Sequence, residues 1–166
     1  MYYLGIDPGV GGAFAIICAD YIDENRWLAY AADMPYHTLI INKQKRRKVD
    51  LAGVVHYLQQ NAAVIEHAFV ENPHSMPKQG VVSAFSFGYG CGAVQMAVQA
   101  LNIPYTLVDP SAWKMRLKLT SDKEQCRRRA SELFSNGSSQ WPKRGDADRA
   151  EAALIAYYGV KALLKK

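Results

Sequence analysis

The sequence predicts one α/β domain, residues 1–166, with a mixed central sheet flanked by helices. Short apolar runs bounded by turn residues open the chain, as the strands of an antiparallel meander do. From residue 50 onward, helical patterns alternate with apolar strands, which is typical of parallel strands in a sheet. Hydrophobic residues make up 49% of the 166, enough for a real core, and no linker or repeat divides the chain.

The elements follow from these patterns in order along the chain. Three strands are expected first, at 2–7, 12–18 and 26–33, then a basic loop, a helix at 50–61 and a strand at 64–71. A long helix rich in small residues is expected at 80–101, a strand at 104–108, one or two helices within 110–134, a loop and a last helix. The last helix, 150–164, is predicted by the helical spacing of Ala153, Leu154, Tyr157, Val160, Ala162 and Leu164.

Two acidic residues stand where predicted strands end. Asp7 follows the apolar run from Tyr2 to Ile6, and Glu71 follows the run from Ala68 to Val70. Ligand sites of open α/β sheets lie at the carboxyl ends of strands. Neighbouring parallel strands are about 4.8 Å apart, so these two carboxylates would reach one cation, and without it they would repel each other.

A third acidic group, Asp146, Asp148 and Glu151, opens the last helix. Asp148 and Glu151 are three residues apart and therefore share one helix face. Oxygen ligands alone suit Mg²⁺ or Mn²⁺, and two such ions roughly 4 Å apart can clamp the attacking and leaving oxygens of a phosphoryl displacement. We therefore interpret the three acidic groups as a two-metal nuclease site.

Each acid also has an ordinary structural explanation. Asp7 could start a turn with Pro8 and Gly9, and Glu71 could pair with a lysine. Asp146 or Asp148 could cap the last helix, with Glu151 in its first turn. The conjunction of all three groups in one short basic chain favours the metal site.

The net charge of +5 and the pI near 9.1 indicate a polyanionic partner. A membrane is the weaker alternative, because no run of about 18 apolar residues appears, and we expect none to be bound. No charged-then-apolar leader is present, and the three cysteines, Cys18, Cys91 and Cys126, are widely spaced without metal-like pairing. We expect a reducing compartment, the cytoplasm of a bacterium or of a phage-infected host, with a nucleus or organelle as the alternative.

Taken together, the motifs resemble the RuvC-type Holliday junction resolvases of the ribonuclease H-like superfamily, with phage-type members nearest. The resemblance spans nearly the whole chain and is carried by Gly5-Ile6-Asp7-Pro8-Gly9, the apolar strand ending in Glu71, the Gly- and Ala-rich helix after it, Val108-Asp109-Pro110-Ser111-Ala112-Trp113-Lys114, and Asp148-Arg149-Ala150-Glu151-Ala152. It implies a ribonuclease H-like fold and a homodimer that cuts four-way DNA junctions symmetrically and leaves 5′ phosphates.

The resemblance also implies the ligands of two Mg²⁺ ions, for which Mn²⁺ is expected to substitute. They are Asp7, Glu71, Asp148 and Glu151. RuvC proteins more often have Asp-x-x-Asp where this chain has Asp148 and Glu151, a longer carboxylate that could still reach a cation. Asp146 is the second choice of ligand, ranked as a cap or an outer residue.

Basic residues are expected to contact phosphates. Lys114 and Lys123 resemble the RuvC lysines near the active site, Lys114 with transition-state charge stabilisation as its role; otherwise both are exposed helix lysines. The densest basic run is either a solvated loop, which could mimic a nuclear localisation signal, or a segment that binds the DNA backbone. It consists of Lys43, Lys45, Arg46, Arg47 and Lys48.

The segment 72–80 lies where resolvases carry a loop that probes the junction centre. His74, Met76 and Lys78 are its candidate DNA contacts, with an apolar wedge at a parted base step as the model; a plain connector is the alternative. His67, inside a strand, is expected in the core.

Gly88, Gly90 and Gly92 superficially fit a dinucleotide fingerprint, but they lie inside a helix rather than between a strand and a helix. Close helix packing explains them better, and in RuvC-type proteins this region forms the dimer interface.

Two other classes of function compete with the resolvase. One is another ribonuclease H-like nuclease acting on structured RNA, which would share the acids but not the junction preference. The other is a non-catalytic DNA-binding module with structural acids. An actin-like nucleotide-binding piece is disfavoured, because those proteins need two large lobes.

Overall fold

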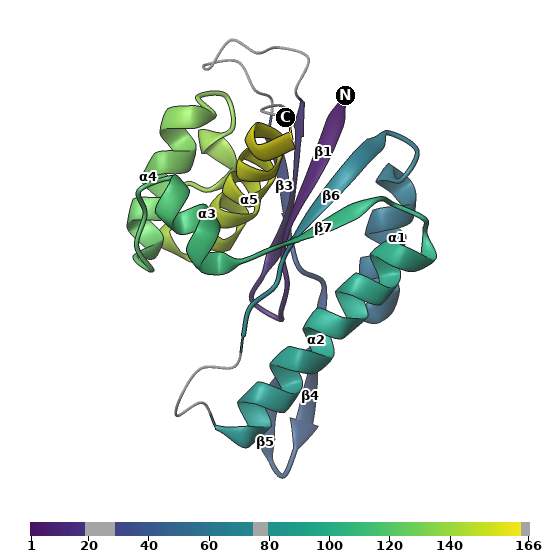
Figure 1. The fold of residues 1–166 in the computed structure, drawn as a ribbon. Helices are drawn as coiled ribbons and strands as arrows, with labels where there is room; N and C mark the ends of the chain where they lie inside the picture. Colours follow the sequence, from purple (N-terminus) through teal and green to yellow (C-terminus); the bar gives the residue numbers. More distant parts are fainter. Residues whose placement is uncertain (19–28, 75–79, 164–166) are drawn as a thin grey trace.

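The computed structural model describes residues 1–18, 29–74 and 80–163 (Figure 1). Its main sheet has five strands in the order β3-β2-β1-β6-β7. The strands are β1 Tyr2–Asp7, β2 Ala13–Cys18, β3 Ala29–Asp33, β6 Ile65–Glu71 and β7 Tyr105–Val108. β1, β2 and β3 pair antiparallel, and β6 joins β1 and β7 in parallel. The mixed sheet that the sequence predicts is therefore confirmed.

Helices cover both faces of this sheet (Figure 1). They are α1 Leu51–Asn61, α2 Val81–Ala100, α3 Pro110–Arg116, α4 Lys123–Leu133 and α5 Ala147–Leu163. α5, with α3 and α4, packs on one face, and α1 and α2 pack on the other. Strands covered on both faces lose the alternation of apolar and polar residues and become continuously apolar, as β1 and β2 are.

Strand parity decides which side chains of β1 meet α5. Tyr3 belongs to the core on the α5 side, whereas Leu4 and Ile6 belong to the core under α1 and α2. Because side chains alternate along a strand, Asp7 lies on the same face as Tyr3. Glu71 likewise shares the face of Phe69 on β6. Both strand-end acids are therefore on the α5 side of the sheet.

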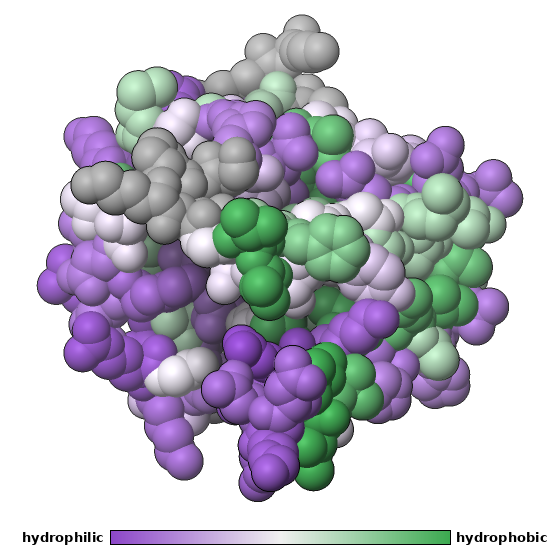
Figure 2. Space-filling view, turned by 90° about the horizontal axis from the view of Figure 1, so that it is seen from below, coloured by the Kyte–Doolittle hydropathy of each residue, from purple (hydrophilic) through white to green (hydrophobic). Residues whose placement is uncertain are grey.

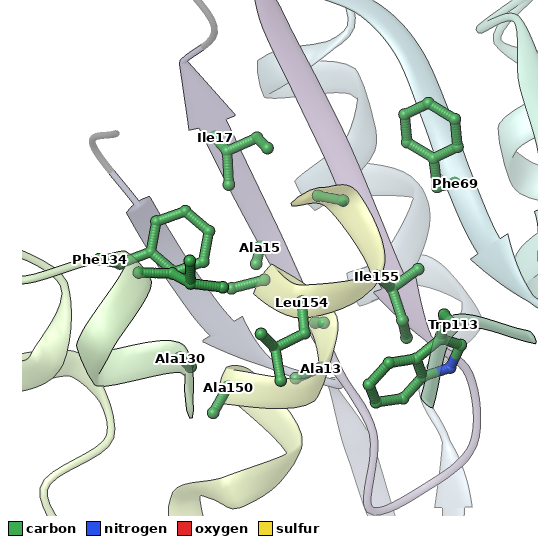
Figure 3. Packing of buried hydrophobic residues seen from close by; sticks show 14 of the residues in the cluster. Ala13, Ala15, Ile17, Phe69, Trp113, Ala130, Phe134, Ala150, Leu154 and Ile155 are labelled. Atoms are coloured by element: carbon green, nitrogen blue, oxygen red, sulfur yellow. The ribbon is translucent and has the colours of Figure 1, made fainter. Parts of the chain in front are cut away.

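Small residues allow α5 to approach the sheet closely. A Cβ at Gly5 would overlap the carbonyl oxygen of Ala152 and lie 2.8 Å from the backbone nitrogen of Ala156. Alanines of α5, among them Ala150, belong to the same buried cluster as Ala13 and Ala15 of β2 (Figure 3). The first turns of α5 are thus held beside the end of β1, where Asp7 stands.

The basic segment expected as a loop is a β-hairpin, so that prediction is wrong. β4 Tyr36–Ile41 pairs with β5 Gln44–Val49 in a separate two-stranded sheet. The turn residues Asn42 and Lys43 have φ of 51° and 63°, the left-handed values of a type I′ hairpin turn. All of β4 and all of β5 except Val49 is exposed. A strand with no buried face has no apolar alternation for the sequence to display.

The hairpin runs beside the first half of α2, beyond the end of the main sheet (Figure 1). At its base, Val49 is buried, and Gly90 of α2 lies against it. Gly90 also adjoins Gly9 in the turn that follows Asp7. The base of the hairpin is therefore connected to the end of β1 through one residue of α2.

Three further predictions need adjustment. The last helix begins at Ala147, three residues before the expected start, because Asp146 ends a short 3₁₀ turn that leads into it. His67 is half-buried rather than in the core, with its Nε2 2.9 Å from Thr106 Oγ1. Within the described residues, α2 has the length and composition of a membrane span, although Val94, Ala97 and Val98 are buried in the core.

Candidate metal centre

Three carboxylates converge at the end of β1. Asp7, Asp148 and Glu151 each offer one oxygen, and these oxygens all lie within 4.8 Å of one another. Asp148 and Glu151 come from the first turns of α5, which the small residues described above hold against β1. Glu151 is the one buried charged side chain among the described residues, only 4% exposed. A buried carboxylate is costly unless a cation or hydrogen bonds compensate it.

The carboxylates disfavour one another's charged forms. Withdrawal from solvent, and then the charges of Glu71 and Glu151, raise the pKa of Asp7 well above its usual range, although Lys123 opposes the shift. Burial likewise raises the pKa of Glu71. This is the electrostatic pattern of a site that is completed by positive charge.

Glu71 is placed by Trp113, a residue to which the sequence analysis gave no role. The indole Nε1 of Trp113 donates a hydrogen bond of 2.8 Å to Glu71 Oε1. Trp113 is fully buried against α5 (Figure 3), and a buried indole N–H needs such an acceptor. Glu71 is not part of the group within 4.8 Å, but its charge acts on Asp7 from the neighbouring strand.

Two lysines border the carboxylates. Lys123, the first residue of α4, has its Nζ 2.5 Å from Asp148 Oδ1 and 2.7 Å from Glu151 Oε2. Although burial disfavours its charged form, Glu151 and Asp148 raise the pKa of Lys123 above its usual range. Lys114 Nζ, from α3, lies 3.7 Å from Glu151 Oε1. Both lysines that the sequence singled out are therefore at this centre.

The residues fit a divalent metal. The Oε1 atom of Glu151 is buried and has no hydrogen-bond partner in the described part of the chain. Glu151 also contributes one oxygen to the group formed with Asp7 and Asp148, and all the donors are hard oxygens, the type that Mg²⁺ and Mn²⁺ prefer. A buried carboxylate oxygen without a hydrogen bond, 3.7 Å from the Lys114 ammonium, is what a bound cation would compensate.

α2 borders the same centre from the opposite face of the sheet end. Burial, followed by the charges of Asp7 and Glu71, raises the pKa of Cys91 to about 11. Cys91 is therefore a neutral thiol near neutral pH. The structure gives it no further role.

Other acids and bases of the motifs lie away from the carboxylates. Asp146, the second-choice ligand, accepts a hydrogen bond of 3.0 Å from the Lys143 backbone N–H and is outside the convergent group. Arg149 turns to Asp33 on β3, with bonds of 2.5 and 2.6 Å that tie α5 to the sheet. Because Arg149 stands between Asp148 and Glu151 in the sequence, its ion pair with Asp33 was not predicted.

Apart from Lys114 and Lys123, the candidate DNA contacts divide into three groups. Lys45, Arg46, Arg47 and Lys48 are exposed on the hairpin. His74 is exposed, with its Nε2 3.5 Å from Asp109 Oδ2. Met76 and Lys78 lie outside the described residues.

Comparison with known proteins gives matches in structure alone. No protein-family model matches the sequence, and no curated protein does. RuvC of Thermus thermophilus is 17% identical, with a TM-score of 0.64 over 98% of this chain and 96% of that chain. The fowlpox virus Holliday junction resolvase is 12% identical, with a TM-score of 0.54 over 97% and 99%. The yeast mitochondrial Holliday junction resolvase is 15% identical, with a TM-score of 0.54 over 98% and 80%.

These likenesses show that the chain has the ribonuclease H-like fold of Holliday junction resolvases. The resemblance inferred from the motifs is therefore confirmed in the fold.

Proposed function

We propose that this chain is a structure-selective endonuclease that resolves four-way DNA junctions by metal-dependent hydrolysis of phosphodiester bonds, leaving 5′ phosphates. One observation carries the proposal: the carboxylates of Asp7, Asp148 and Glu151 converge beside Glu71 at the end of a resolvase-fold sheet. A solved T. thermophilus RuvC in complex with a Holliday junction substrate has the same fold, with a TM-score of 0.63.

Asp7, Glu71, Asp148 and Glu151 would hold two Mg²⁺ ions, with Mn²⁺ as a substitute. When bound, such ions activate water as the nucleophile and stabilise the leaving oxygen. Trp113 fixes the orientation of Glu71 through its N–H donor. Lys123 orients Asp148 and Glu151, and Lys114 places a positive charge where it stabilises the negative charge that develops on the phosphoryl group.

A homodimer through α2 fits this substrate. Val81, Phe85 and Met96 form an exposed apolar stripe along the helix, with exposed fractions of 85%, 77% and 65%. Gly88 and Gly92 lie on the same stripe, where an added Cβ would meet nothing within 4 Å. Such a stripe allows a second helix to approach closely. An isologous dimer presents two equivalent sites to the two strands that must be cut.

Cleavage of a labelled synthetic four-way junction tests the function. Linear duplex and an RNA/DNA hybrid serve as parallel substrates, with Mg²⁺ or EDTA, and with wild type or Glu71→Gln. We expect paired nicks confined to the junction that require both Mg²⁺ and Glu71. Cutting of RNA-containing substrates alone would assign another ribonuclease H-like activity, and tight binding without any cutting would leave a non-catalytic DNA-binding protein.

A further inference from the structure

The positive charge of the protein is concentrated in the β4–β5 hairpin. The chain contains 20 Lys and Arg and 15 Asp and Glu. Residues 36–49 include five of the basic residues and none of the acidic ones, so the rest of the chain carries equal numbers of both. The whole net charge of +5 therefore corresponds to this one exposed element.

Strand alternation divides the basic residues between two sides of the hairpin. Directly paired residues of antiparallel strands share a side. The pairs Ile40 with Lys45 and Thr38 with Arg47 define what we call the outer side. The inner side consists of the pairs Leu39 with Arg46 and His37 with Lys48.

Contacts distinguish the two sides. On the inner side, the Lys48 ammonium lies 4.4 Å from the centre of the Tyr89 ring of α2, and His37 and Leu39 line the same recess. Arg46 donates a hydrogen bond of 2.8 Å to Gln44 Oε1. On the outer side, the Arg47 guanidinium lies over the ring of Tyr36, at 4.9 Å, within the hairpin itself. At the base, Val49, which pairs with Tyr36 on the outer side, packs against Gly90 of α2. Beyond the base, Lys48 of the inner side contacts α2, whereas Arg47 of the outer side stacks within the hairpin.

The hairpin extends from the same end of the sheet as the carboxylates (Figure 1). Its six-residue strands reach roughly 20 Å, which corresponds to about six base pairs along a duplex. Figure 2, which looks at this end of the molecule, shows strongly hydrophilic groups directly beside hydrophobic ones. A duplex whose cut phosphate lies at the metal centre would therefore have phosphates within reach of the hairpin.

We propose that the outer side of the hairpin, through Lys45 and Arg47, binds the phosphates of a duplex arm beside the cut strand. The proposal rests on the junction-cutting function proposed above. Of the inner-side cations, Lys48 contacts Tyr89 of α2 and Arg46 is hydrogen-bonded to Gln44, and both contribute little to DNA binding. Stacking on Tyr36 fixes the planar guanidinium of Arg47, so less freedom is lost when it binds a phosphate.

DNA explains this side better than a membrane does. Ile40 is the strongly exposed aliphatic side chain of the outer side, at 76%, and it stands opposite Lys45. One isoleucine among cations buries little apolar surface in a bilayer, whereas cations alone are sufficient for phosphate contacts. The hairpin also extends from the same end of the sheet as the carboxylates of the proposed nuclease site, which likewise favours DNA over a membrane.

Two double variants with the same change of charge test the proposal. Lys45→Gln with Arg47→Gln removes the outer pair, and Arg46→Gln with Lys48→Gln removes the inner pair. Both are made in an Asp7→Asn parent, which does not cut. Affinity for a four-way junction is measured across a range of salt concentrations. Each phosphate contact contributes about 0.9 to the slope of log K against log salt. The double variant that removes the outer pair should therefore reduce the magnitude of the slope by about 1.8. The inner pair should change it by much less.

The possible results distinguish a failure of the outer-side proposal from a failure of the proposed function. Equal slopes for the two double variants, or a larger loss for the inner pair, would overturn the outer-side proposal while junction binding by the parent stands. A parent that does not bind junctions, with a wild type that does not cut them, would refute the proposed function itself. The parent could instead bind phosphatidylserine vesicles. If removing the outer pair abolished that binding and left junction binding unchanged, the surface would be assigned to membranes.

Discussion

At the scale of single residues, Lys123 is the counter-ion of the carboxylates. Its ammonium touches both Asp148 and Glu151, and it comes from α4, 25 residues earlier than Asp148. Asp148 and Glu151 repel each other across one helix face, so the lysine stabilises them when no metal does so.

Lys123→Met should therefore destabilise the metal-free protein and increase its response to metal. The two carboxylates lose a charged donor, and because Lys123 is partly exposed, we expect a loss of about 1–2 kcal/mol in the free energy of unfolding. Added Mg²⁺ should then raise the melting temperature more than in the wild type. Thermal unfolding in EDTA and in Mg²⁺ measures both effects, with Lys45→Met on the hairpin as the control. An unchanged Mg²⁺ response would contradict this role.

The ion pair of Arg149 with Asp33 predicts a dependence of stability on pH. Hydrogen bonds from the Arg149 guanidinium hold the pKa of Asp33 below its usual value. The pair therefore stabilises the fold above the unfolded pKa of about 3.8, and this contribution is lost as the pH falls through the lower folded pKa. Because Asp33 is largely exposed, Asp33→Asn should cost at most about 1 kcal/mol near neutral pH. Urea unfolding from neutral to acidic pH should show the difference from wild type shrinking; a constant difference would contradict it.

At the scale of elements, the contact between β1 and α5 positions the metal centre. Gly5→Ala would insert a methyl group into the backbone of α5 at Ala152, which cannot move aside as a flexible side chain would. We expect destabilisation of about 3 kcal/mol or more, with loss of Mg²⁺ binding by any folded fraction. Gly11→Ala is the control, because an added Cβ there meets nothing within 4 Å. Urea unfolding and Mg²⁺ titration measure the effects, and equal stability of the two variants would refute the close contact.

What the sequence could predict at this scale depended on burial. The strands of the main sheet are covered on both faces, and their apolar runs located β1, β2 and β6 to within a residue or two. The hairpin has no covered face, so the same reasoning described Gln44–Val49 as a loop. The remaining sequence signal for a hairpin was the type I′ turn at Asn42 and Lys43. Lysine is not a typical residue of such a turn, so the signal was weak.

The sequence could likewise predict only part of the candidate site. Strand ends and helix spacing predicted that Asp7, Asp148 and Glu151 converge, with Glu71 on the neighbouring strand, because these rules are local. The hydrogen bond from Trp113 to Glu71 and the contact of Lys123 with α5 depend on how α3 and α4 pack. No pattern in the sequence specifies that packing. A Trp next to a candidate lysine, in a chain with only three Trp, was the available signal for Trp113.

At the scale of the whole molecule, the exposed stripe on α2 predicts how the proposed dimer can be separated. Gly92→Leu adds a bulky side chain where the monomer has open space, so the fold should tolerate it and could gain up to about 1 kcal/mol from better helix propensity. A facing helix could no longer approach. Light scattering at micromolar concentration should show a dimer for the wild type and a monomer for Gly92→Leu.

Ser86→Leu is the matched control for this variant. Ser86 is exposed on the same helix, six residues earlier and therefore about 120° away from Gly92. It should leave the dimer intact. A wild type that is monomeric, or a Gly92→Leu variant that stays dimeric, would contradict an interface on this stripe.

The β4–β5 hairpin has one further consequence, for the distribution of stability within the chain. A sheet of two strands consists only of edges, and this one is anchored to the core mainly at Val49. Its amide hydrogens should exchange with solvent through local opening, at a much lower free energy than those of β1, which require global unfolding. The carboxylates and the β4–β5 hairpin should therefore belong to separate cooperative units. Under the proposed function, the hairpin would be able to change shape to follow differently angled duplexes while the carboxylates keep their geometry.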